Sequence, residues 1–114
     1  MSEPYSLSNT HVLITGAGSG IGRLMALGAA KRGASHLVLW DLNLPAAKAV
    51  AKEVEALGAA ALPMSVDVSK KSAVSAAAAQ VLEKIGHLDV LINNAGVVTG
   101  KRFLELEEKD VALT

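Results

Sequence analysis

Four glycines alternate with other residues in a short segment near the start of the chain. Gly16, Gly18, Gly20 and Gly22 follow the apolar run 12–14, and an amphipathic helical pattern begins directly after them. Glycine has no Cβ, so the backbone can turn tightly there and approach a ligand closely. The unpaired N–H groups and the positive dipole at the start of a helix attract anions. The segment therefore predicts a phosphate-binding turn between a strand and a helix.

The spacing of these glycines discriminates among phosphate-binding motifs. A G-x-G-x-x-G motif that starts at Gly16 fails because Ile21 occupies its sixth position. A P-loop fails as well, since no Gly-Lys-Ser/Thr sequence follows the turn. With Thr15, the glycines at 16, 20 and 22 instead form the pattern T-G-x-x-x-G-x-G. A simple strand-to-helix connection is the alternative interpretation, but the flanking strand and helix favour the anion site.

An acidic residue follows the second apolar run, at the distance expected for a nucleotide site. Asp41 comes nineteen residues after Gly22. A carboxylate there can accept hydrogen bonds from the two hydroxyls of a ribose and would repel a 2′-phosphate. Ala17 and Ser19 in the turn and Leu42 after the aspartate supply no cation that a 2′-phosphate would need. The pattern predicts NAD(H) rather than NADP(H), the alternative being a solvated aspartate at the start of a loop.

A second acidic residue, Asp67, ends the third apolar segment, 60–66. Its carboxylate could accept from the amino group of an adenine while Val68 packs on the ring. An aspartate that only flanks a helix capped by Ser69 is equally consistent with the sequence. His11, His36 and His87 lie at strand starts, at the end away from these residues, so we assign them no chemistry and expect no metal site.

Strand and helix patterns alternate along the chain, which predicts a parallel α/β sheet with helices on both faces. Strands are expected at 11–15, 36–40, 60–66 and 88–92, and Asn43 is expected to cap the second helix. In the doubly wound order 3-2-1-4, ligands bind at the carboxyl ends of the strands. The glycine turn and both aspartates lie at those ends, and this coincidence is stronger than any single residue.

Two finer features follow from the same patterns. Pro63 inside the third strand favours an edge position, because proline cannot donate to a strand ladder. The first helix carries apolar and small residues at helical spacing, which predicts a buried stripe composed of Ile21, Leu24, Met25, Gly28 and Ala29.

The composition excludes several classes of function. The chain has 114 residues, which is enough for one domain, and its formal net charge is zero, so nothing favours nucleic acid or an anionic membrane as a partner. It contains no cysteine, which removes thiol catalysis and thiolate metal ligation. No apolar run approaches the ~20 residues that span a bilayer, and the first ten residues lack a signal-peptide core. We expect an intracellular, most simply cytoplasmic, protein.

The chain resembles the N-terminal half of the short-chain dehydrogenase/reductase family in four segments at matching intervals. These segments are TGAGSGIG (15–22), Asp41, Asp67-Val68 and NNAG (93–96). The resemblance implies a Rossmann-like domain over 11–114 with an N-terminal arm of 1–10. It implies that NAD phosphates lie along the turn, the ribose at Asp41, the adenine at Asp67, and that NNAG closes the site. The cofactor-binding residues it implies are Gly16, Ala17, Gly18, Ser19, Gly20, Ile21, Gly22, Asp41, Leu42, Asp67, Val68, Asn93, Asn94, Ala95 and Gly96.

The family resemblance also implies chemistry that this chain does not carry. Family members use a Tyr-x-x-x-Lys pair, whereas the only tyrosine here is Tyr5 and Asn9 stands four residues later. We therefore expect half of a family member, inactive alone, whose alcohol or carbonyl substrate binds through residues not in this chain. LVLWD (37–41) and NNAGVV (93–98) resemble the subgroup acting on retinoids, steroids and other lipid alcohols.

Two other readings of the chain remain. It could be a complete, non-catalytic dinucleotide-binding or interaction module. A methyltransferase would also combine a glycine turn with an acidic second strand end, although NNAG argues against it. With the strand order 3-2-1-4, the fourth strand, 88–92, is expected to be an unpaired edge, because the sheet is incomplete there. Such an edge is a template for association, so we expect a homo-oligomer.

Overall fold

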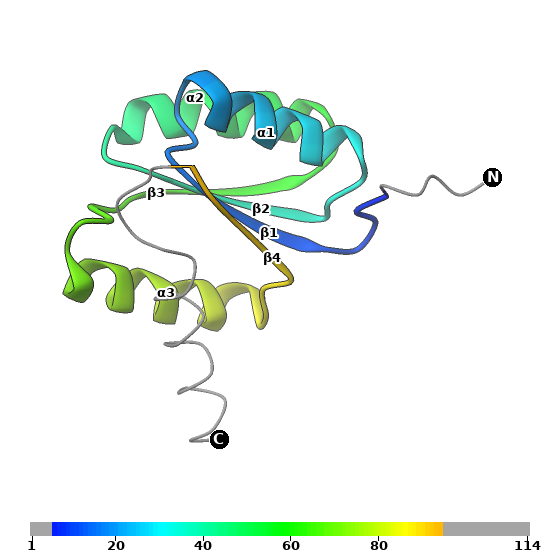
Figure 1. Cartoon of the computed structure of the whole chain (residues 1–114). Helices are drawn as coiled ribbons and strands as arrows, with labels where there is room; N and C mark the ends of the chain where they lie inside the picture. Colours follow the sequence, from blue (N-terminus) through cyan, green and yellow to red (C-terminus); the bar gives the residue numbers. More distant parts are fainter. Residues whose placement is uncertain (1–5, 95–114) are drawn as a thin grey trace.

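The computed structural model describes residues 6–94, which form a four-stranded parallel sheet with helices on both faces (Figure 1). The strand order is β3-β2-β1-β4, which confirms the predicted doubly wound arrangement. The strands are β1 (His11–Thr15), β2 (His36–Asp41), β3 (Ala60–Ser65) and β4 (Val90–Asn93). The helices are α1 (Gly20–Lys31), α2 (Leu44–Ala56) and α3 (Lys71–Ile85).

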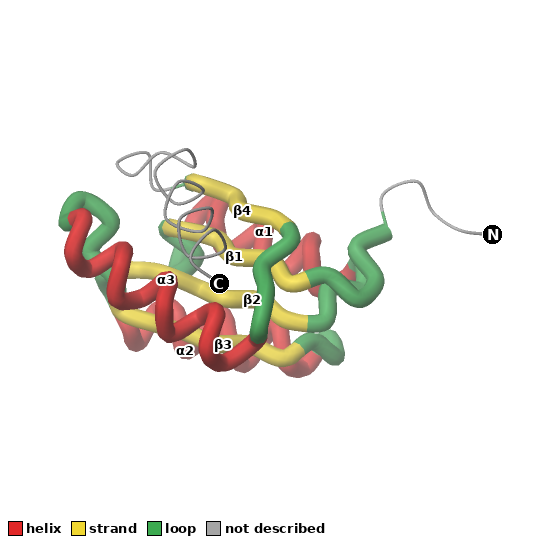
Figure 2. The backbone as a smooth tube through the Cα atoms, turned by 90° about the horizontal axis from the view of Figure 1, so that it is seen from below, coloured by secondary structure: helices red, strands yellow, loops and turns green. Residues whose placement is uncertain are grey.

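Each face of the sheet is covered by different helices. Helices α1 and α2 lie together on one face and α3 lies alone on the other, as the two views show (Figures 1 and 2). Because successive side chains of a strand point to opposite faces, the apolar runs of β1 and β2 supply both cores. Val12, Ile14, Leu37 and Leu39 pack toward α1 and α2. Leu13, Val38 and Trp40 pack toward α3.

The two central strands are apolar along their length because both of their faces are covered. All five residues of β1 are buried, and so are the four central residues of β2. The edge strands β3 and β4 are only partly buried. Pro63 lies in β3 and opposite Leu39 of β2, so the edge position predicted from this proline is confirmed.

The helix boundaries show one correct and one wrong cap. The side chain of Asn43 accepts a hydrogen bond from Ala46 N–H at 3.1 Å, as predicted for the start of α2. The cap predicted at Ser69 is wrong, because α3 begins one residue later and its N-cap is Lys70. The Ser69 hydroxyl donates to Asp67 Oδ1 at 2.6 Å, a charge-assisted hydrogen bond within the loop before α3.

The buried stripe predicted for α1 is also only partly correct. The buried residues of this helix are Gly22, Ala26, Ala29 and Ala30, whose small side chains let it lie close to the sheet. Ile21 and Leu24 are 63% and 62% exposed, and Met25 is 38% exposed. These larger side chains do not lie on the face of α1 that contacts β1 and β2. They have the spacing of a helical face, but they form a second, exposed apolar surface.

That second surface is an apolar groove of about 540 Å³ between α1 and the exposed side of β4. Its lining includes Ile21, Leu24, Met25 and Ile92, together with Leu7, whose backbone N–H donates to the Arg32 carbonyl at 2.9 Å. Among the helices of residues 6–94, none has both the length and the apolar character that a membrane crossing requires.

Candidate functional site

The glycine turn lies at the carboxyl end of β1 and adopts a conformation that suits glycine. Gly16 has φ +66° and Gly20 has φ +58°, both in the left-handed region that other residues rarely adopt. Ala17 between them is buried, and its N–H donates to the Trp40 carbonyl at 3.1 Å. The turn is therefore attached to the end of β2 as well as to β1.

Gly20 and Gly22 differ in the space that surrounds them. A Cβ at Gly22 would lie 1.9 Å from the Gly16 carbonyl oxygen and 2.8 Å from Asn94 Nδ2. This glycine allows α1 to pack directly on the turn. A Cβ at Gly20 would meet no described atom within 4 Å. The space beside Gly20 is therefore open, as a ligand-binding turn requires.

The first turn of α1 is not capped by a side chain. Ser19 is the N-cap, but its exposed side chain makes no capping hydrogen bond, and the first turn contains no acidic residue. The first N–H groups of a helix have no partner within the helix. The N–H groups at 20–22, with the positive end of the dipole, therefore suit the binding of an anion beside Gly20.

Two backbone hydrogen bonds hold Asp41 next to the turn. Its Oδ2 accepts from Gly18 N–H at 2.8 Å, and its Oδ1 accepts from Asn43 N–H at 2.9 Å. A Cβ at Gly18 would lie 2.8 Å from the same Oδ2, so this glycine permits the approach of the carboxylate. Because each carboxylate oxygen has two lone pairs, both can still accept from a ligand.

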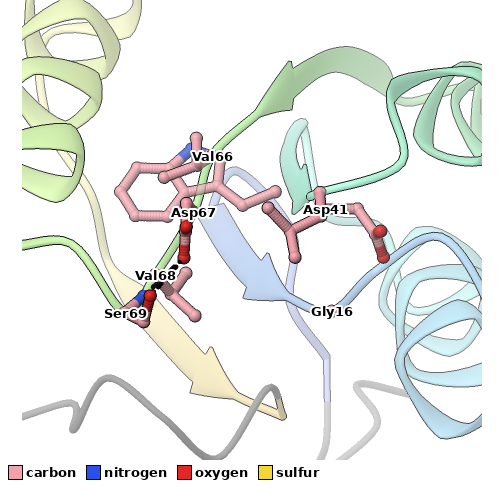
Figure 3. A pocket seen from close by; sticks show the side chains of 8 residues that line it. Gly16, Asp41, Val66, Asp67, Val68 and Ser69 are labelled. Atoms are coloured by element: carbon pink, nitrogen blue, oxygen red, sulfur yellow. Dashed lines mark hydrogen bonds between the residues drawn. The ribbon is translucent and has the colours of Figure 1, made fainter.

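A cavity of about 430 Å³ opens between the ends of β1 and β2 and the loop that follows β3. Figure 3 shows Asp41 on one side and Asp67, Val68 and Ser69 on the other. None of the residues that line it is basic. The lining residues are Gly16, Trp40, Asp41, Leu42, Val66, Asp67, Val68 and Ser69.

The apolar part of the cavity is built from the loop after β3 and the end of β2. Val66 and Val68 are 4% and 9% exposed and belong to the core beneath α3, whereas Leu42 is 70% exposed. Val66 was missed by the sequence interpretation. Its alternation with Val68 was the available signal, since residues two apart in an extended segment share a side.

Asp67 is ionised and partly engaged. Its Oδ1 accepts from the hydroxyl and the N–H of Ser69, at 2.6 and 3.0 Å. The hydroxyl bond first, and the N–H bond second, hold the pKa of this carboxyl below its usual value. The Ser69 bonds match the reading of Asp67 as a loop-stabilising residue. Neither bond uses Oδ2, and Asp67 is one of the residues that line the cavity.

The two asparagines at the end of β4 support the turn from the other side. Thr15 Oγ1 donates to Asn93 Oδ1 at 2.9 Å, and Asn94 Nδ2 donates to the Gly16 carbonyl at 3.3 Å. These bonds connect β4 to the end of β1. Of the remaining expected site residues, Ala95 and Gly96 lie outside the described residues.

Arg23, the basic residue nearest the turn in sequence, points to the neighbouring helix. Its Nε donates to Glu53 Oε1 at 2.9 Å, and its Nη2 donates to Oε2 at 2.5 Å. The bidentate pair joins α1 to α2. It raises the pKa of Arg23 and lowers the pKa of Glu53, mainly through the hydrogen bonds between the two side chains.

A parallel sheet of order β3-β2-β1-β4, with a glycine turn and a cavity at its carboxyl end, defines a dinucleotide-binding α/β domain. Residues 10–114 match the short chain dehydrogenase family, and the chain belongs to that family. Epidermal retinol dehydrogenase 2 of Homo sapiens is 46% identical over 99 residues. That alignment covers 86% of this chain and 32% of the relative, so the chain spans about a third of its length.

Solved structures of the family agree with this fold. A metagenomic short-chain oxidoreductase in complex with NADP superimposes with a TM-score of 0.75 at 38% identity, covering 80% of this chain and 41% of the other. An NAD⁺-bound xylitol dehydrogenase superimposes with a TM-score of 0.71 at 30% identity, covering 75% and 32%. The family therefore uses NAD or NADP, and the choice between them depends on residues of the individual protein.

Proposed function

We propose that residues 15–22, Asp41 and the loop after β3 bind the adenosine half of NAD(H), in a protein that oxidises or reduces an alcohol/carbonyl pair. The observation that carries the proposal is the position of Asp41. Its carboxylate is held by two N–H groups, borders the cavity and lies beside the glycine turn.

The described residues fit the dinucleotide from the phosphates outward. The pyrophosphate would lie along Gly16, Ser19 and Ile21, beside the open space at Gly20. The ribose hydroxyls would donate to Asp41, and the adenine would lie against Val68 with its amino group donating to Asp67. When bound, the nicotinamide of NAD exchanges a hydride with the substrate. The residues of this chain bind and orient the cofactor.

The electrostatics of the cavity favour NAD over NADP. A 2′-phosphate beside Asp41 would place two like charges close together, and none of the lining residues is basic. Since the solved relatives include one NADP complex and one NAD⁺ complex, family membership is neutral on this point. Asp41 is the residue that carries the preference.

The substrate proposal is coarser because it rests on the relatives. The similarity to a retinol dehydrogenase supports a lipid alcohol or the corresponding carbonyl compound. The proton relay would use a tyrosine–lysine pair that is not among residues 1–114. We also propose that the protein forms a homo-oligomer, with the partly buried edge strand β4 and the groove beside it as the contact surface.

Calorimetric titration with NADH and NADPH tests the proposal. We expect the protein to bind NADH at least about tenfold more tightly, since like-charge repulsion of about 1.4 kcal/mol gives that ratio. Asp41→Asn should reduce the ratio toward one, because it removes the charge but keeps an oxygen for Gly18 N–H. Glu55→Gln removes an equal charge from an exposed position of α2 and should leave the ratio unchanged. Equal affinities in the unaltered protein would contradict the role of Asp41.

A further inference from the structure

The opposite end of the sheet contains a cluster of imidazoles that the nucleotide site does not use. The sequence interpretation gave no role to His11, His36 and His87 because they lie at strand starts, away from the nucleotide site. The structure brings all three together. The rings of His11 and His87 stack with centroids 4.0 Å apart, and those of His11 and His36 meet edge to face at 4.3 Å.

Asp89 joins this cluster through two contacts. Its Oδ2 accepts from the His11 backbone N–H at 2.8 Å and lies 3.2 Å from His87 Nε2. Asp89 N–H also donates to the His11 carbonyl at 3.0 Å, so the loop before β4 is fastened to the start of β1. The backbone bond from His11 is the main cause that lowers the pKa of Asp89, so this carboxylate is ionised.

The hydrogen bond of the His11 ring sets its tautomer. His11 Nδ1 lies 2.9 Å from the carbonyl oxygen of His87. A carbonyl oxygen only accepts, so Nδ1 carries the proton and Nε2 of the neutral ring keeps its lone pair. A histidine that donates one nitrogen to a backbone carbonyl and offers the other is the usual arrangement of a metal-binding imidazole.

From this geometry we propose that His11, His87 and Asp89 form a binding site for a divalent transition-metal ion of the zinc type. Their ligand atoms all lie within 4.8 Å of one another. Tetrahedral zinc bound to two imidazoles and a carboxylate, with water in the fourth position, is a common ligand set. The ion would take the place of the direct contact between His87 Nε2 and Asp89 Oδ2.

Accessibility and charge both suit an ion at this place. His11 is buried, which fixes one ligand. The lone pairs of stacked rings lie in parallel planes and do not converge on one ion, so His87, whose side chain is 59% exposed, would turn out of the stack to complete the site. His87 directly follows Gly86, the C-cap of α3. The negative end of that helix dipole favours a cation. The ion would fasten the loop before β4 to β1, far from the glycine turn at the other end of the strand.

Titration of the untagged protein with Zn²⁺ tests the proposal, after removal of metals with a chelator. We expect one equivalent to bind and to raise the unfolding temperature, because an ion that binds the folded state stabilises it. Tetrahedral Co²⁺ in the same site should give a visible absorption band. His11→Asn, which keeps a donor for the His87 carbonyl, and His87→Gln should each weaken binding at least about tenfold.

His36→Gln is the matched control, since it removes a neighbouring imidazole that is not one of the three ligands. It should leave the zinc affinity unchanged. An equal loss in His36→Gln, or an unchanged affinity in His87→Gln, would overturn the assignment. The His87 variant keeps the test decisive even if His11→Asn unfolds, because its altered side chain is exposed. Far-ultraviolet circular dichroism of each variant without metal verifies that it is folded.

Discussion

The two ends of this parallel sheet use their polar groups in opposite ways. At the carboxyl end, the start of α1 has no side-chain cap, and Asp41 borders a cavity of about 430 Å³. At the amino end, His11, His87 and Asp89 bond to one another and to nearby backbone groups. Helices that run back along parallel strands place their N-termini at the first end and their C-termini at the second. Anions are therefore favoured at one end and cations at the other.

The largest test of this comparison is Gly22→Ala at the carboxyl end. The added Cβ would lie 1.9 Å from the Gly16 carbonyl oxygen, so the turn and α1 must separate. We expect a loss of more than about 3 kcal/mol in the free energy of unfolding, measured with urea. Gly28→Ala is the control in the same helix, where a Cβ would be 3.4 Å from the flexible end of Arg32. It should be neutral or stabilising, and equal losses would show that the contact at Gly22 relaxes freely.

Gly20→Val should separate nucleotide binding from stability. Its Cβ has open space but its φ of +58° disfavours valine, and the side chain would occupy the space proposed for the pyrophosphate. We expect loss of NADH binding with a cost of about 1–3 kcal/mol in stability. Gly58→Val imposes a comparable strain at φ +100° after α2 and should retain NADH binding.

Gly20→Val and His87→Gln together test whether the two ends of the sheet act independently. Zinc affinity should be unchanged in Gly20→Val, and NADH affinity should be unchanged in His87→Gln, because the two sites lie at opposite ends. If Gly20→Val bound NADH normally, the pyrophosphate would lie elsewhere. A loss of NADH binding in His87→Gln would show that the ends are coupled.

The smallest expected effect concerns acid stability at the carboxyl end. Asp67 has a lower pKa in the folded protein than its ordinary value of 3.8, mainly because the Ser69 hydroxyl donates to it. Its contribution is therefore complete above pH 3.8 and is lost as the pH falls through the folded pKa. In Asp67→Asn the free energy of unfolding should therefore fall less steeply as the pH is lowered below 3.8. Thermal unfolding of both proteins at a series of pH values provides the measurement, and an equally steep fall in the two would contradict it.

The sequence predicted features that depend on local pattern. The alternation of strands and helices, the cap at Asn43 and the edge position of Pro63 each depend on a few neighbouring residues. The strand order followed from general rules for parallel sheets and from the family resemblance. The cap predicted at Ser69 was wrong by one residue, because the sequence pattern does not fix the exact residue at which a helix begins. Only the folded loop shows that the Ser69 hydroxyl donates to Asp67.

Other features depend on contacts between distant segments and could not be predicted. The spacing of Ile21, Leu24 and Met25 fits a helix but does not show which face meets the sheet. The glycine at 18 is explained by Asp41, twenty-three residues away. His11 and His87 are separated by seventy-six residues and meet only because β4 pairs with β1. The sequence places these histidines at strand starts, but it does not show that their rings come into contact.

Pro63 has a consequence for how the sheet can be enlarged. At β3 a residue without an N–H interrupts the outer row of donors, whereas β4 (Val90–Asn93) contains no proline. A further strand, whether from the same polypeptide or from another molecule, is therefore expected to add beside β4. The sheet can therefore be extended in one direction only: strand addition is disfavoured at the β3 edge and permitted at the β4 edge.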